Sequence, residues 1–179
     1  MFYLFIIIFI LFLLILLLRT LKSGIQSRKL SHQPNPSSIS VQEKYARRLS
    51  EMIKCATVSV KGSHDDKEYA KLRSAVSTLF PLLHSKSELK IFSSDCWLYH
   101  IQGADRNRRI MLMSHHDVAP VTGNWEHEPF GGEIHDGRLW GRGTVDTKTS
   151  LFAEMQALEE LFENEWKPPC DVYLSSSCN

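Results

Sequence analysis

Residues 110–117 read IMLMSHHD, and the fold that we expect follows from this stretch. The apolar run Ile110–Met113 is short and continuous, which is typical of a β-strand covered on both faces. The polar residues after it stand at the carboxyl end of that strand, where open α/β sheets place their ligands. The stretch therefore predicts a buried strand with a functional edge.

Helical and strand-like segments alternate along the rest of the chain. Apolar residues recur at three- and four-residue intervals in several windows, which is helical spacing, and short apolar runs lie between them. The predicted helices are Val41–Cys55, Tyr69–Phe80 and Thr147–Asn164, and the further predicted strands are Leu89–Phe92, Trp97–Ile101 and Asp171–Ser175. Helices that alternate with apolar strands predict an α/β layer fold.

Polar segments without a period separate these elements. Residues 31–40 read SHQPNPSSIS, and this density of proline and serine predicts a linker. Residues 61–66 and 121–137 are predicted to be loops. Residues 106–109 hold three arginines, the one tight basic cluster near the quoted stretch, and we expect them in a solvated turn.

The composition excludes some classes of function. The formal net charge of +1 gives no electrostatic reason to expect a nucleic-acid partner. No cysteine belongs to a CxxC pair, which argues against a structural zinc knuckle. We expect buried free thiols, with two disulfides as the alternative in an oxidising compartment. The cysteines are Cys55, Cys96, Cys170 and Cys178.

The N-terminal run differs from the rest of the chain. Met1–Leu18 contains no charged residue, no glycine and no proline. At roughly 1.5 Å per helical residue it reaches about 27 Å, close to a hydrocarbon core of ~30 Å. It lacks a basic start and a small-residue cleavage site, so we favour a retained anchor over a cleaved signal peptide. We expect a single-pass transmembrane signal-anchor over residues 1–21, a linker over 22–40 and a domain over 41–179.

His115 and Asp117 form the first candidate metal-binding element. Side chains of an extended strand alternate with a period of two, so these two point to the same side. A metal-bound imidazole usually donates its other N–H to a carboxylate, carbonyl or water, and Asp117 meets that need for His115. Taken alone, the pattern also fits a polar strand end whose histidines form ordinary hydrogen bonds and bind no metal.

Asp146 is the second candidate. It follows the sequence GRGTV at residues 141–145, in which two glycines permit close backbone approach or a positive φ before a helix. A carboxylate at that helix N-terminus, facing the edge of the sheet, can bridge two cations. Taken alone, Asp146 also fits a plain helix N-cap.

The order of the motifs is more specific than either element. The chain carries HxDVxP, then W-x(3)-PF, then DG-x(2)-WGRG-x(2)-D-x-K. This set resembles the aminoacylase/carboxypeptidase S family of zinc metallopeptidases, and most closely its N-fatty-acyl-amino-acid synthase/hydrolase branch, over residues 41–178. The resemblance implies a three-layer zinc-peptidase-like α/β domain with a central mixed sheet, here incomplete at the C-terminus.

The resemblance also implies roles for single residues. His115 matches the first zinc ligand, Asp117 the catalytic-site acid that orients that histidine, and Asp146 the aspartate that bridges two Zn²⁺ ions. The implied activity is metal-dependent hydrolysis of amide bonds in peptides or N-acyl amino acids. We expect His116, His127 and His135 not to be ligands.

Relatives in this family carry a Glu-Glu pair, general base and zinc ligand, after a strand like Val172–Cys178. The present sequence stops at Asn179, before that pair is expected. Since catalytic zinc normally takes three protein ligands, we expect an N-terminal fragment with little or no turnover. The alternative is a non-catalytic truncated membrane protein that retains part of the fold.

The side of the membrane stays open. Arg19, Lys22, Arg28 and Lys29 follow the apolar run and no basic residue precedes it, which by the positive-inside tendency favours a cytosolic domain. Relatives with an N-terminal hydrophobic segment mostly work in a vacuole or outside the cell. We therefore expect a single-pass membrane protein of the secretory pathway, vacuole or extracellular side, with its orientation undecided.

Overall fold

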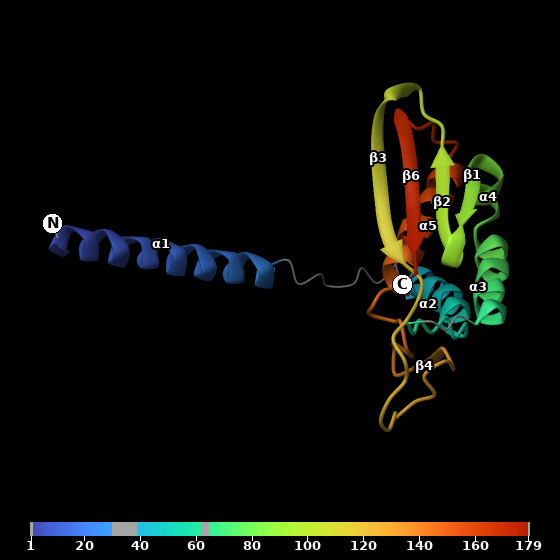
Figure 1. Ribbon diagram of the computed structural model, residues 1–179, viewed down its shortest axis with the longest axis horizontal. Helices are drawn as coiled ribbons and strands as arrows, with labels where there is room; N and C mark the ends of the chain where they lie inside the picture. Colours follow the sequence, from blue (N-terminus) through green and yellow to red (C-terminus); the bar gives the residue numbers. More distant parts are fainter. Residues whose placement is uncertain (1, 30–38, 62–64, 179) are drawn as a thin grey trace. The chain divides into compact units, whose positions relative to one another are not determined.

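The computed structural model describes residues 2–29, 39–61 and 65–178 (Figure 1). The chain divides into two units, Met1–Val41 and Gln42–Asn179. Most of the linker predicted at residues 31–40, and part of the loop predicted at residues 61–66, lie outside the described residues.

The first unit contains helix α1, Phe2–Lys29. The apolar side chains described along it are exposed, among them Ile7, Phe9 and Leu18. Among the described residues, no helix meets the length and hydropathy that crossing a bilayer requires. The signal-anchor expected over residues 1–21 therefore stays a prediction.

A four-stranded mixed sheet organises the second unit, and its strand order is β1-β2-β6-β3. The strands are β1 (Glu88–Phe92), β2 (Cys96–Ile101), β3 (Asp105–His115) and β6 (Cys170–Ser177). β3 pairs with β6 in parallel, whereas β6 with β2 and β2 with β1 are antiparallel. The predicted α/β class with a mixed sheet is confirmed, and each of the four strands overlaps a predicted one.

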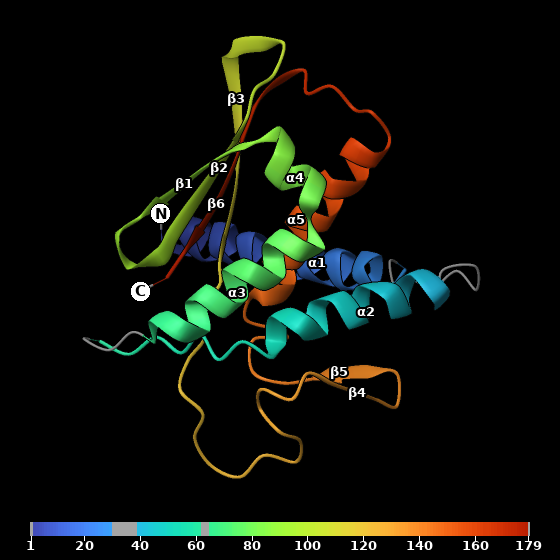
Figure 2. The same ribbon diagram turned by 90° about the vertical axis from the view of Figure 1, so that its right-hand side faces the viewer.

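Helices pack on one side of this sheet (Figure 2). They are α2 (Ile39–Ile53), α3 (Asp66–Leu79), α4 (Pro81–Lys86) and α5 (Lys148–Glu163). The core between the layers includes Trp97 and Leu174 from the sheet and Met52, Leu72 and Leu151 from the helices. A covering layer on the other face, which a three-layer domain requires, is not found within the described part of residues 42–179.

The expectation of a strand buried on both faces was wrong for β3. Ile110, Met111 and Met113 are 51%, 53% and 71% exposed. Two features explain this exposure: among the described residues of the second unit the helices cover one face of the sheet, and β3 is the last strand in the sheet order, so it has one neighbouring strand there. Residues 106–109 are also not in a turn: they belong to β3, where the register with β6 shifts between Asp105 and Arg109.

Residues 121–137 are not loop throughout. Strand β4 (Glu133–His135) pairs with β5 (Arg138–Trp140) in a hairpin. Its two turn residues, Asp136 and Gly137, have φ values of 50° and 69°. An Asp-Gly pair with both φ angles positive is the preferred chemistry of a two-residue hairpin turn.

The cap expected at the start of the last helix is also different. Thr147, not Asp146, occupies the N-cap position of α5, and it makes no capping hydrogen bond through its side chain. The carboxylate of Asp146 is consequently not engaged as a helix cap. All four cysteines are free thiols; Cys55 and Cys170 are buried, as expected, whereas Cys96 and Cys178 are only partly buried.

Candidate metal centre

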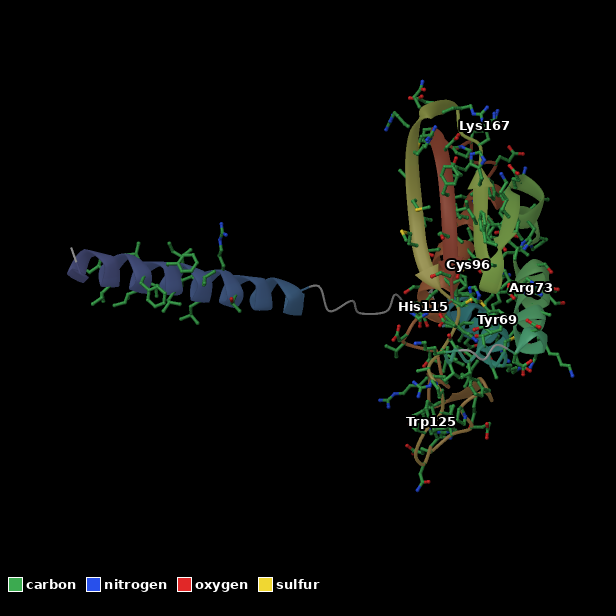
Figure 3. All side chains as sticks on the ribbon, in the orientation of Figure 1. Tyr69, Arg73, Cys96, His115, Trp125 and Lys167 are labelled. Atoms are coloured by element: carbon green, nitrogen blue, oxygen red, sulfur yellow. The ribbon has the colours of Figure 1, made fainter. Side chains whose placement is uncertain are left out.

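His115 is the last residue of β3 and lies at its carboxyl end (Figure 3). Its imidazole lies between two carboxylates. Its Nδ1 is 3.0 Å from Oδ1 of Asp117, and its Nε2 is 3.2 Å from Oδ1 of Asp146. These are the three residues that the sequence singles out, and the fold brings them together although 31 positions separate His115 from Asp146.

Backbone contacts hold Asp117 in place. After β3 the chain forms a parallel bridge between Val118 and Val58. The amide of Val118 donates to the carbonyl of Thr57 at 2.9 Å, and the hydroxyl of Thr57 donates to the carbonyl of His116 at 2.6 Å. Asp117 is only 6% exposed as a result. A buried carboxylate in a fixed position is suited to orienting an imidazole.

A glycine turn brings Asp146 to the same place. Gly141 and Gly143 have φ values of 150° and 91°. A Cβ on Gly143 would lie 2.8 Å from Cγ1 of Val118, so the turn packs directly on the segment that carries Asp117. Only glycine combines that φ with that approach.

Lys148, which the sequence analysis did not single out, ties this turn to helix α2. The side chain is fully buried, and its Nζ donates to the carbonyls of Met52 at 3.0 Å and Cys55 at 2.5 Å. Burial lowers the pKa of Lys148 to about 8. A cation at the last carbonyls of a helix is favourable. The D-x-K spacing was the available signal for this residue.

The geometry of His115 and Asp146 fits a divalent metal. Ligands 2.0–2.1 Å from a tetrahedral zinc are about 3.3 Å apart, and the Nε2–Oδ1 separation is 3.2 Å. Because Nδ1 is directed at Asp117, Nε2 is the nitrogen available to a cation. In the described part of the chain, no group of three or more His, Cys, Asp or Glu side chains surrounds one metal position.

A pocket of about 530 Å³ opens beside these side chains. Its walls include three acidic or imidazole groups and two cationic ones. The residues that line it are Ser59, Lys61, His115, Asp117, Val118, Ala119, Arg142 and Asp146. A ligand of several heavy atoms therefore has room next to the candidate metal ligands.

The remaining histidines of the motif region lie elsewhere. His116 is fully buried, stacks on Trp97 with ring centroids 4.1 Å apart, and shares a 2.7 Å hydrogen bond with the hydroxyl of Ser176. Its burial lowers the pKa of His116 to about 4, so this ring is neutral at pH 7. His127 and His135 lie in the loop and hairpin after β3, where they pair with Glu133 and Asp136.

Residues 111–179, which include all three candidate site residues, match the model of peptidase family M20/M25/M40. The chain is 31% identical over 137 residues to probable carboxypeptidase S-like 2 of Dictyostelium discoideum, covering 73% of this chain and 26% of that protein. It is 33% identical over 141 residues to the N-fatty-acyl-amino acid synthase/hydrolase PM20D1 of Xenopus tropicalis, and the match covers 74% of this chain and 28% of that protein. This chain belongs to peptidase family M20/M25/M40.

A solved M20 structure shares the fold. The metallo-carboxypeptidase Sso-CP2 of Sulfolobus solfataricus superposes with a TM-score of 0.60 and 25% sequence identity, over 75% of this chain and 30% of that one. The chain thus spans between a quarter and a third of the length of these M20 relatives, 26% and 28% of the two curated proteins.

Proposed function

We propose that this chain contributes the first part of a zinc site to a hydrolase of amide bonds in peptides or N-acyl amino acids. The observation that carries the proposal is the position of the His115 ring between Asp117 and Asp146. The names of the M20 relatives, carboxypeptidases and an N-fatty-acyl-amino acid synthase/hydrolase, support the reaction class. The activity of the whole protein and its substrates are part of the proposal.

The side chains of the site have separate tasks in it. Asp117 accepts the Nδ1–H of His115 and so presents the Nε2 lone pair to the cation. Asp146, whose side chain is 86% exposed, has two carboxylate oxygens with which it can serve two ions. Bound zinc supplies polarisation of the scissile carbonyl and a water of lowered pKa.

The zinc proposal is tested by a titration against a competing chelator with the chain Met1–Asn179. We expect His115→Ala and Asp146→Asn each to weaken zinc binding at least tenfold, because each removes one of two ligands. His135→Ala, in the exposed hairpin, is the matched control and should bind as the wild type does. Zinc binding that neither ligand variant changes would rule out this site.

A non-catalytic role is the second candidate function. It is favoured by the finding that the described residues offer fewer than three ligands around one metal position. The two candidates are separated by sequencing the full transcript beyond the codon for Asn179. A Glu-Glu pair that continues in frame supports the enzyme, whereas a stop codon supports the non-catalytic protein.

We further propose that residues 1–21 hold the protein at a membrane as a single-pass anchor. Support comes from the absence of charged residues before Arg19 and from exposed apolar side chains along α1, among them Ile7 and Phe9. The test is alkaline extraction of membranes from cells that express the chain. The full chain should stay in the membrane pellet and a chain without residues 1–21 should not; equal distribution would exclude the anchor. Orientation and compartment stay predictions.

A further inference from the structure

Two thiols lie together at one end of the sheet, on neighbouring strands. The register of β2 with β6 pairs Trp97 with Ser176, and one further step along both strands brings Cys96 opposite Ser177. Cys178 is the next residue of the chain. Directly opposite residues of an antiparallel pair have Cα atoms about 4.5–5.5 Å apart. The backbone positions of the two cysteines therefore fall near the Cα separation of about 4.4–6.8 Å that a disulfide requires.

The side chains of these two cysteines also meet. The thiol of Cys178 is in hydrogen-bonding contact with the thiol of Cys96 and with the hydroxyl of Tyr69. Cys178 follows the last residue of β6, so the alternation of side chains along a regular strand does not direct it away from Cys96. Cys96 and Tyr69 are labelled in Figure 3. A bond between the two sulfur atoms consequently needs only a local movement of side chains.

The same two thiols are the accessible ones among the four. Cys96 and Cys178 are partly exposed, whereas Cys55 and Cys170 are buried, at 0% and 5% exposed. A small oxidant in solution reaches a partly exposed sulfur more readily than a buried one. Contact and exposure together select one pair of cysteines.

We propose that Cys96 and Cys178 form a reversible disulfide, and that a small-molecule disulfide such as oxidised glutathione is the oxidant. This inference goes beyond the proposed function and does not depend on zinc binding. The bond ties the end of β6 to the start of β2 and closes a loop that contains β3 and α5. A cross-link of this kind stabilises a fold chiefly because it restricts the unfolded chain.

The exchange balances over two steps. The Cys96 thiolate attacks one sulfur of oxidised glutathione, the S–S bond of the oxidant breaks, and one glutathione leaves and takes up the proton lost by Cys96. The sulfur of Cys178 then loses its proton and attacks the sulfur of Cys96 in the mixed disulfide, and the second glutathione leaves with that proton. Two protein thiols are oxidised, and one glutathione disulfide is reduced to two thiols.

The order of these steps follows from the surroundings of Cys178. Burial and, after it, the neighbouring Cys96 raise the pKa of Cys178 to about 12. The thiolate is the nucleophile in disulfide exchange. Because Cys178 is protonated at pH 7, Cys96 is the sulfur that attacks first.

The experiment oxidises the chain Met1–Asn179 in glutathione buffers that range from reducing to oxidising, with a chelator present so that no metal holds the thiols. The protein is then unfolded, alkylated and digested with chymotrypsin, which cuts between Cys170 and Cys178 at Tyr173. Mass spectrometry should find Cys96 and Cys178 in one cross-linked peptide pair that has lost two hydrogen atoms, and dithiothreitol should restore both thiols. Stable mixed disulfides at both positions, a bond between two copies of the chain, or no oxidation would overturn the inference.

Variants assign the bond to the named sulfur atoms. In Cys178→Ser we expect glutathione to stay on Cys96 as a mixed disulfide, because no neighbouring thiol displaces it. Cys96→Ser should form no cross-link. Cys170→Ala, at a buried position of β6, is the matched control and should form the cross-link as the wild type does. A cross-link that Cys170→Ala loses, in protein whose thermal unfolding stays cooperative, would overturn the pairing.

The unfolded chain tests whether the fold brings the two thiols together. In concentrated urea the sheet no longer directs the pairing of the four cysteines. We expect the bond between Cys96 and Cys178 to form in the folded chain at glutathione ratios at least tenfold more reducing than in the unfolded chain. Equal yields of this bond in folded and unfolded protein would show that the register of β2 with β6 is not its cause.

Discussion

At the scale of single residues, the sharpest prediction concerns a substitution of Asp117. It is 6% exposed and its Oδ1 lies 3.0 Å from Nδ1 of His115. Asp117→Asn keeps the shape but removes the charge that fixes the tautomer of the imidazole. We expect zinc affinity to fall about 10- to 100-fold, as measured by chelator competition. His127→Gln is the control outside the site; equal affinities of all three proteins would show that Asp117 does not orient the ligand.

Two glycines with positive φ permit a matched comparison. Alanine at Gly143 would place its Cβ 2.8 Å from Val118, whereas alanine at Gly137 meets nothing within 4 Å. Both substitutions carry the cost of a left-handed conformation, and only Gly143→Ala adds overpacking, which costs about 1–3 kcal/mol. We expect urea unfolding to show Gly143→Ala less stable than Gly137→Ala by that margin. If both variants lost the same free energy of unfolding, the turn would be able to move away from Val118 without cost.

The sequence predicts which residues come together in the candidate site better than it predicts which other residues hold them in place. His115, Asp117 and Asp146 carry a recognisable order, and the fold brings them within hydrogen-bond distance. Lys148 has no local signal of burial, because a lysine at the start of a helix is ordinarily solvated. Its partner Met52 lies 96 positions away in α2, and only tertiary packing shows that contact.

At the scale of elements, the long helices and paired strands follow from periodicity. The predictions that were wrong concern two features that apolar periodicity does not reveal: which layers cover a strand, and where very short strands lie. An apolar run predicts a strand but not the layers that cover it. The described helices cover one face of the sheet and β3 is its last strand, so the apolar side chains of β3 are exposed. β4 and β5 have three residues each, too few to show an alternation. The Asp136-Gly137 pair was the signal that could have predicted their hairpin.

The contact between β3 and α5 has a pH dependence that can be measured. The hydroxyl of Ser114 donates to Oε2 of Glu154 at 2.8 Å, and burial raises the pKa of Glu154 from its ordinary value of 4.5. The folded state therefore binds this proton more tightly than the unfolded state does. Its stabilising contribution is complete below pH 4.5 and is lost as pH rises through the folded pKa.

Glu154→Gln tests the direction of this pH dependence, because glutamine still accepts a hydrogen bond from Ser114 but does not ionise. We expect the variant to gain stability relative to the wild type between pH 4 and pH 7 in urea unfolding. Glu163→Gln, at an exposed position of the same helix, is the matched control. A difference between Glu154→Gln and wild type that is constant over this range would contradict the linkage.

At the scale of the whole molecule, the second unit contains its own hydrophobic core. The core cluster draws on buried residues from Leu49 in α2 to Leu174 in β6. The boundary between the two units falls after Val41, close to the domain start expected at residue 41. Chains with one contiguous core and few crossing contacts fold as units, so this part of the chain should fold without the N-terminal helix.

Deletion of residues 1–38 tests that independence, because it removes α1 and leaves α2 complete. We expect a cooperative thermal transition whose midpoint differs from that of the full chain by less than about 2 °C, since the core residues of the described part of the chain all follow residue 38. Deletion of residues 1–53 is the control that should fail, because it also removes Leu49, Met52 and Ile53 from the core. Losing three such side chains at about 2–5 kcal/mol each is comparable with the whole stability of an ordinary domain, about 5–15 kcal/mol. If the shorter deletion also abolishes cooperative unfolding, the N-terminal unit is needed for the fold of the second.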